Sequence, residues 1–183
     1  MKSQRLTVFW VIMLATIALD QILKNWVRSH LNVGESWKGG PWHGVFEITL
    51  TYNKGIAFGM LQGGGLIMTP IAIVIAGFAI WTIYKNANET RWGTVALGLL
   101  ASGALGNLID RLFNSKSGVT DMFLLRLANI THGRFSDFPV FNVADSCISV
   151  AMVMLLISWS KQSAVEKEES VPPQEAKLED PTV

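Results

Sequence analysis

Four apolar segments, each long enough to cross a membrane, constrain the fold of this 183-residue chain more than any other feature. A helix needs about 20 apolar residues to span the ~30 Å hydrocarbon core of a bilayer. The predicted membrane helices occupy residues 6–24, 66–84, 92–110 and 143–159. The sequence therefore predicts a mainly α membrane protein, with a single polytopic domain over residues 1–160.

The composition agrees with a membrane protein. The chain is 50% hydrophobic and only 16% charged, whereas a soluble domain carries about 25% charged residues. A net charge of +1 gives no positive field that would attract nucleic acid. Cys147 is the single cysteine, and the three histidines lack ligand spacing. We therefore expect neither a metal site nor a cofactor.

The number of predicted helices is even, so both termini are expected on the same side of the membrane. Basic residues near the helix ends on that side, among them Lys85 and Arg91, favour the cytoplasm. A cleaved signal peptide is the alternative for residues 6–24, but no small-residue cleavage site follows them. Residues 161–183 are charged and contain prolines, so we predict a disordered cytoplasmic tail.

Two long connections join the first helix to the second and the third helix to the fourth. In the first connection, apolar and polar residues alternate from Val45 to Tyr52, and β-branched residues are frequent. This period of two predicts a β-strand. We therefore expect a small β-sheet in the loop after the first helix, on the outer surface of the membrane.

Polar residues from three of the predicted helices reach the same face of the membrane. In chain order they are Asp20, Asn107, Asp110, Arg111, Asn142 and Asp145. Ionisable groups at membrane depth are unfavourable and usually mark function. Helix ends in the headgroup region are the alternative, and Asp20 can also pair with Lys24 within one helix. Helix ends alone explain one such cluster more easily than three.

Asp145 has two possible roles. An Asn followed by an acidic residue three positions later, as in Asn142 and Asp145, is typical of a helix N-cap. Alternatively, Asp145 pairs with Asp121 of the second long connection for acid–base chemistry on a substrate in the membrane surface. Two adjacent carboxylates do not both ionise readily, so one would hold a proton. The helix dipole favours Asp145 as the ionised member, which leaves the proton on Asp121.

Other interpretations remain open at this stage. Asn53 lies two residues before Gly55 and is typical of a turn, although it could also donate a hydrogen bond to a substrate backbone. A transporter could use the same carboxylates, but transport sites tend to lie near the membrane midplane at repeat interfaces, and the sequence has no internal repeat. A non-catalytic membrane scaffold is the third class.

Five stretches of the chain, in the same order as in the family, resemble lipoprotein signal peptidase, also called signal peptidase II, of bacterial plasma membranes. They are LDQILK at 19–24, NKGIAF at 53–58, GALGNLIDR at 103–111, GVTD at 118–121 and FNVADS at 141–146. The resemblance extends over nearly the whole chain except the tail.

The resemblance implies four transmembrane helices with an extracytoplasmic β-sheet cradle. It also implies an aspartic endopeptidase that cleaves the signal peptide from diacylglyceryl-modified prolipoproteins immediately before the lipidated cysteine. The catalytic pair then falls on Asp121 and Asp145. The residues that bind substrate or brace the site are then Asp20, Asn53, Asn107, Asp110, Arg111 and Asn142.

The family also implies the cellular location of the protein and its binding partners. It implies a multi-pass protein of the bacterial plasma (inner) membrane, with the active site at the extracytoplasmic face. Membrane lipids and globomycin-type peptide inhibitors are the further partners, and the chain is expected to act as a monomer.

The chain departs from the family pattern beside these motifs. Thr120 and Met122 flank Asp121 where the family more often has valine and phenylalanine. Ile56 replaces a common small residue, and Ser102 a common glycine. Residues 124–139 form a rather long segment. These differences concern the shape of the substrate pocket and not the chemistry.

Overall fold

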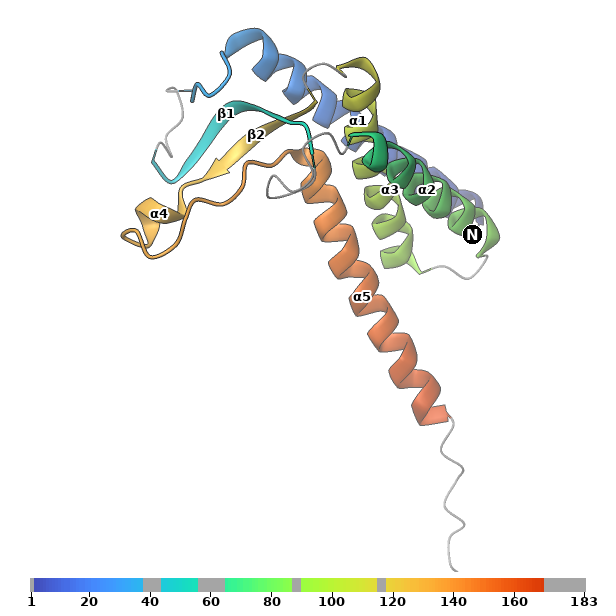
Figure 1. Ribbon diagram of the computed structural model, residues 1–183. Helices are drawn as coiled ribbons and strands as arrows, with labels where there is room; N and C mark the ends of the chain where they lie inside the picture. Colours follow the sequence, from blue (N-terminus) through green and yellow to red (C-terminus); the bar gives the residue numbers. More distant parts are fainter. Residues whose placement is uncertain (1, 38–43, 56–64, 87–89, 115–117, 170–183) are drawn as a thin grey trace, which may run out of the picture.

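The computed structural model describes residues 2–37, 44–55, 65–86, 90–114 and 118–169 (Figure 1). Its elements are, in chain order, α1 (Lys2–His30), β1 (Phe46–Asn53), α2 (Gly65–Lys85), α3 (Arg91–Phe113), β2 (Val119–Leu125), α4 (Leu127–Ile130) and α5 (Val143–Glu169). Four helices, α1, α2, α3 and α5, are long and apolar enough to cross a membrane. The prediction of four membrane helices with a small sheet is confirmed.

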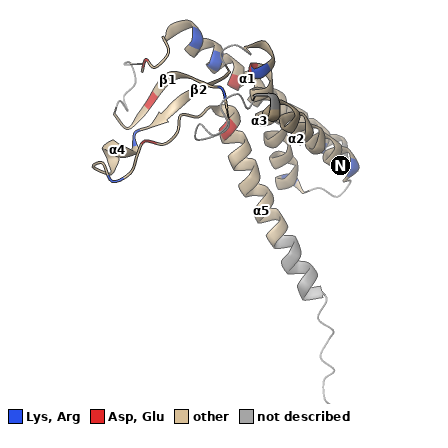
Figure 2. Cartoon of the chain, viewed as in Figure 1, with Lys and Arg blue, Asp and Glu red and all other residues tan. Residues whose placement is uncertain are grey.

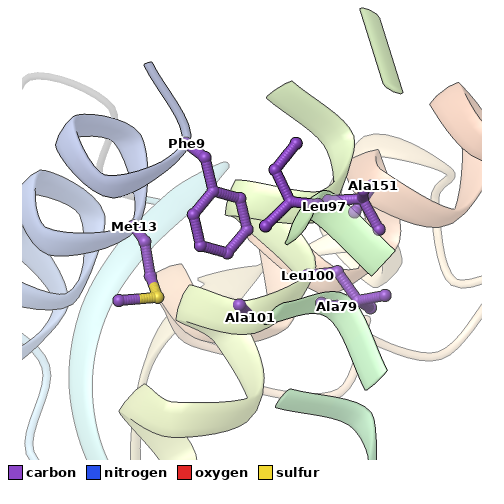
Figure 3. Packing of buried hydrophobic residues seen from close by; sticks show 8 residues of the cluster. Phe9, Met13, Ala79, Leu97, Leu100, Ala101 and Ala151 are labelled. Carbon is purple, nitrogen blue, oxygen red and sulfur yellow. The ribbon is translucent and has the colours of Figure 1, made fainter. Parts of the chain in front are cut away.

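Helix α3 is the centre of the bundle. In its most apolar window 72% of the residues are buried, against 17–22% in the other three helices, and it packs against each of α1, α2 and α5. Figure 3 shows this packing, in which Phe9 of α1 lies near Leu97 of α3 and Ala79 of α2 lies near Leu100 of α3. The other helices therefore turn most of their apolar surface towards lipid.

Two glycines let the backbone of α3 approach its neighbours closely. A Cβ atom at Gly103 would overlap the carbonyl oxygen of Ala144 and lie 2.6 Å from Ile148 Cγ1. A Cβ atom at Gly106 would lie 2.9 Å from Asp20 Oδ2. Small residues at these positions allow the start of α5 and a polar side chain of α1 to reach the same part of α3.

The sheet consists of β1 and β2, which are antiparallel, with Thr51 opposite Asp121. It packs on the last turns of α1 through a cluster that contains Val27, Leu50 and Met122. The sheet therefore lies at one end of the helix bundle, and β2 carries Asp121 to that end.

The predicted strand at residues 45–52 is confirmed as β1, and the predicted small sheet is present, but the sequence pattern does not identify the partner strand of this sheet. Its second strand, β2, comes from the connection between α3 and α5. Most residues of β2 are buried, on both faces of the strand. Such a strand has no alternation of apolar and polar residues, so its sequence carries no period-two signal.

Two helices extend beyond their predicted ends. Helix α1 continues past residue 24 to His30, and α5 continues past residue 160 to Glu169. The predicted disordered tail therefore begins as helix. Its first residues, KQSAVEKEE, are mostly good helix formers, which prolong a helix that is already nucleated. The rest of the predicted tail, 170–183, lies outside the described residues.

Substitution of Gly103 tests the close contact between α3 and α5. We expect Gly103→Ala to destabilise the protein by about 1–3 kcal/mol, because the added methyl group must displace backbone of α5. The matched control is Gly77→Ala in α2, where an added Cβ meets nothing within 4 Å. This control should be neutral or slightly stabilising. Thermal unfolding in detergent measures both, and equal melting temperatures would contradict the packing described here.

Candidate active site

A cleft of about 630 Å3 is lined by residues of β2, α3 and α5. Asp121 of β2 and Asp145 of α5 both line it. Asp121 lies in the paired part of the sheet and is only 2% exposed. Asp145 lies in the first turn of α5 and is half-buried. The two carboxylates of the predicted pair therefore reach one cleft from different elements.

The remaining lining of the cleft is largely apolar. It includes Val119, Phe138, Phe141, Ile148 and Val150. Charged residues gather around this end of the bundle, whereas the middle turns of the helices carry few of them (Figure 2). The cleft thus combines a polar side with an apolar side that continues along α5.

Asn142 connects the two carboxylates. Its side-chain oxygen accepts a hydrogen bond from the backbone N–H of Asp145 (2.9 Å), and its own backbone N–H donates to Asp145 Oδ2 (3.2 Å). This reciprocal pair is a capping box. The amide Nδ2 of the same side chain donates to Asp121 Oδ1 (2.6 Å). The capping arrangement and the proximity of the two acids therefore occur together.

Asn107 of α3 extends this network. Its Nδ2 donates to Asp145 Oδ1 (2.8 Å), while its Oδ1 accepts from Asn142 Nδ2 (3.1 Å) and from Lys24 Nζ (3.0 Å). One amide thus contacts the carboxylate of α5, its capping residue and a cation of α1.

Lys24 is completely buried and is shared between two carboxylates. Its ammonium lies 2.8 Å from Asp20 and 3.4 Å from Asp110. Asp20 also accepts a hydrogen bond from the backbone N–H of Ala144 in α5 (3.0 Å). A buried carboxylate is stable only when it is paired and hydrogen-bonded. Lys24 therefore neutralises the acids that tie α1, α3 and α5 together.

Asp110 has further partners on β2. Its Oδ2 accepts from the backbone N–H of Thr120 (2.8 Å), and its Oδ1 lies 3.2 Å from Arg28 Nη1. The same Arg28 nitrogen donates to Thr120 Oγ1 (2.9 Å). These bonds fix the residue next to Asp121 against α1 and α3. They also give Thr120 a role in holding the strand.

Asn53 and Arg111 approach the carboxylates from other sides. Asn53 at the end of β1 accepts from the backbone N–H of Gly55 (3.0 Å), and its side chain also hydrogen-bonds to Asp121. Arg111 lines the cleft, within electrostatic range of Asp121 and Asp145. The turn interpretation of Asn53 is therefore confirmed, while its hydrogen bond to a substrate backbone remains a prediction.

The structure brings all of the predicted site residues to this end of the bundle, while Ile56 lies outside the described residues. What the sequence reasoning missed is Arg28 and the sharing of Lys24 between Asp20 and Asp110. The signal was available, because residues 20, 24 and 28 are spaced by four and share one face of a helix. Ending the first helix at residue 24 left Arg28 in a loop.

Burial, and after it the nearby charge of Asp145, raise the pKa of Asp121 to about 7. Hydrogen bonds from Asn142 and Asn53 and the charge of Lys24 oppose the rise. At neutral pH a large share of Asp121 is therefore protonated, so the pair can offer one acid and one base at once.

Among the residues that the structure describes, no group of three or more His, Cys, Asp or Glu side chains could hold a metal ion. The chemistry open to the cleft's own residues is proton transfer between carboxyl groups and a bound water or substrate. The expected absence of a metal remains a prediction.

Fold and site together define a polytopic membrane protein with a two-carboxylate cleft at one end of its bundle. Residues 12–161 match the family model for signal peptidase (SPase) II. The chain is 37% identical to the lipoprotein signal peptidase of Streptococcus pneumoniae (strain ATCC BAA-255 / R6), over 83% of this chain and 92% of that protein. It is 35% identical to the lipoprotein signal peptidase of Streptococcus pyogenes serotype M1, over 87% and 96%.

Solved structures agree with these relatives. A bacterial membrane enzyme determined by the in meso method at 2.3 Å resolution superposes with a TM-score of 0.74 at 29% identity, over 90% of this chain and 94% of that chain. A second bacterial membrane enzyme, at 1.9 Å resolution, gives a TM-score of 0.68 at 28% identity, over 82% and 91%.

The chain belongs to the signal peptidase II family. It is therefore a multi-pass bacterial membrane protein and an aspartic peptidase that removes signal peptides from prolipoproteins. The family membership decides against the transporter and scaffold alternatives.

Removal of the Lys24 ammonium tests the buried network. We expect Lys24→Met to lower stability by about 3–5 kcal/mol, because Asp20 and Asp110 lose their shared cation. The double variant Lys24→Met/Asp20→Asn should recover part of this loss. Lys85→Met, at the exposed end of α2, is the control and should change stability by no more than about 0.5 kcal/mol. Unfolding in detergent measures all three, and a Lys24→Met variant as stable as the control would refute the shared neutralisation.

Proposed function

We propose that Asp121 and Asp145 are the catalytic pair of this signal peptidase. They hydrolyse the peptide bond immediately before the lipidated cysteine of a diacylglyceryl-modified prolipoprotein. The observation that carries the proposal is the joining of two carboxylates from separate elements by Asn142 within one cleft. No other pair of acids lines this cleft among the described residues.

In the proposed reaction Asp145 is the base. It accepts hydrogen bonds from Asn107 and from the backbone of Asn142 at the start of α5, an arrangement suited to a carboxylate. Asp145 takes a proton from water as the water oxygen forms a bond to the peptide carbonyl carbon. Asp121 gives its proton to the carbonyl oxygen. Collapse of the tetrahedral intermediate breaks the C–N bond. The leaving amine takes the proton from Asp145, and a hydroxyl proton of the intermediate returns to Asp121 as the C=O bond re-forms.

The cleft also suits the shape of a lipidated substrate. Phe141, Ile148 and Val150 form an apolar wall that continues onto the lipid-facing side of α5, so acyl chains can remain in the bilayer while the peptide bond reaches the acids. Arg111 and Asn53 line the polar wall and can hydrogen-bond the substrate backbone. Globomycin-type peptides are proposed to occupy the same cleft and compete with the substrate.

The proposed orientation places both termini in the cytoplasm and the cleft at the extracytoplasmic face of the plasma membrane. Support comes from the basic residues Lys2, Arg5, Lys85 and Arg91, which lie at the helix ends opposite to the cleft. A monomer suffices for the reaction, because one chain supplies every residue of the proposed site.

Replacement of either acid tests the catalytic pair. We expect Asp121→Asn and Asp145→Asn to insert into the membrane normally and to lose on the order of 10³-fold or more in cleavage of a diacylated precursor, since neither amide transfers a proton. Ser149→Ala, also in the cleft, is the control and should cleave normally. A chelator should leave the wild-type rate unchanged. Near-normal cleavage by either Asn variant would remove that residue from the pair.

The pH profile tests the proton on Asp121. Because its pKa is raised to about 7, the protonated form is lost as pH rises through that value, and the rate should fall there. The hydrogen bond from Asn53 lowers this pKa. Asn53→Ala should therefore move the fall in rate to higher pH.

The control for this measurement is Met68→Leu, which changes a cleft residue that is neither acidic nor a hydrogen-bond donor. Its profile should coincide with that of the wild type. An Asn53→Ala profile that is unmoved, or that moves to lower pH, would contradict the assignment of the proton to Asp121.

A further inference from the structure

The segment between β2 and α5, residues 127–140, exposes more apolar surface than a loop in water usually does. We call it the 127–140 loop, and it contains α4. Three large hydrophobic side chains of this loop are exposed: Ile130 by 49%, Phe135 by 65% and Phe138 by 47%. Clustered exposed apolar side chains of this kind mark an interaction surface.

The loop is built as an ordered unit. At its base Arg126 forms ion pairs with Glu47 of β1 (3.0 Å) and with Asp137 on the returning chain (2.9 Å). The other oxygen of Asp137 accepts from the backbone N–H of Ala128 (3.1 Å). The backbone N–H of Phe138 donates to Leu125 of β2 (3.0 Å). The loop is therefore tied to both strands of the sheet.

The position of the loop relates it to the membrane. In Figure 1, α4 lies below the sheet, at the end away from the helix bundle. It is at about the level where α5 begins. Helix α5 is a candidate membrane span from Val143 onwards, and its Val150 and Val153 side chains are exposed. The backbone of the loop is thus level with the first residues of a membrane span.

The composition of the loop is suited to the membrane–water interface. His132 and Arg134 are exposed between Ile130 and Phe135, while the acid of the loop, Asp137, is paired with Arg126. Aromatic side chains next to basic ones are typical of segments that lie in the headgroup region and contact anionic lipids.

We propose that the 127–140 loop inserts Ile130 and Phe135 into the lipid interface, where Arg134 binds anionic phospholipid headgroups. Through Arg126 the inserted loop holds the sheet, and with it Asp121, at a fixed height above the bilayer. The insertion depends only on the membrane-spanning fold. Its effect on cleavage rests on the proposed function.

A spin label measures the depth of the loop without any reference to activity. In a Cys147→Ala background, Phe135→Cys is labelled with a nitroxide in vesicles of phosphatidylcholine, with or without phosphatidylglycerol. The matched control is Val33→Cys, because Val33 is equally exposed (67%) but lies in the segment that pairs with the far edge of β1. Melting temperatures establish beforehand that each labelled variant is folded.

The label at position 135 should collide more with oxygen, which dissolves in lipid, than with a water-soluble nickel chelate. The label at position 33 should show the reverse. A label at 135 that behaves like the one at 33, or that neither reagent reaches, would overturn the insertion. Phosphatidylglycerol should increase the depth at 135, and Arg134→Gln should abolish that increase. Equal depths in both vesicle types would overturn the headgroup contact.

Cleavage kinetics in vesicles test whether insertion of the loop affects the active-site cleft. Ile130→Ser/Phe135→Ser should raise KM for a diacylated precursor about tenfold and leave kcat unchanged, because the loop acts on placement in the membrane and not on the reacting atoms. Val33→Ser should change neither constant. A loss confined to kcat, or no change at all, would overturn the height-setting role. The spin-label experiment does not measure cleavage, so its outcome does not depend on the catalytic assignment of Asp121 and Asp145. The insertion of the loop and the catalytic pair can therefore be refuted independently.

Discussion

The buried ammonium of Lys24 is the interaction on which the rest of the structure depends. Asp20 and Asp110 lie on different helices and are almost fully buried, so without the shared cation they would repel each other and Asp20 would lose its paired charge. With Lys24 between them, they are free to bind backbone N–H groups of α5 and β2. The charges that hold the helix ends together therefore also fix the two elements that carry the cleft acids.

Asn142 shows how local and tertiary structure combine at this point. A capping residue needs only an acceptor atom towards its own helix, which leaves the amide nitrogen of an asparagine free for other partners. Here that nitrogen donates to Thr120, Asn107 and Asp121. A serine cap would offer one hydroxyl and could not provide these contacts. In the sequence, the helix N-cap and the pairing of Asp145 with Asp121 are alternative explanations of this stretch. The structure contains both arrangements.

Much of this arrangement could be predicted from the sequence, because membrane helices and helix ends leave strong signals. The apolar segments predict four membrane helices. Because successive helices cross the membrane in opposite directions, Asp20, Asp110 and Asp145 are expected at the same end of the bundle, as observed. The partner strand β2 could not be predicted from its pattern, since it is buried on both faces. The link between Asp110 and Thr120 joins an acid to a backbone N–H, and a backbone group has no sequence signature. The proposed catalytic roles rest on the family motifs and on the geometry together.

The pKa of Asp121 adds a final argument about stability. An ordinary carboxyl group titrates near ~4 in an unfolded chain, and Asp121 titrates near 7 in the folded protein. Between these values the unfolded chain has lost a proton that the folded protein keeps, so the free energy of unfolding falls as pH rises through this range. Below it, Asp121 has no such effect. The burial that suits this residue for proton transfer thus destabilises the protein at neutral and higher pH.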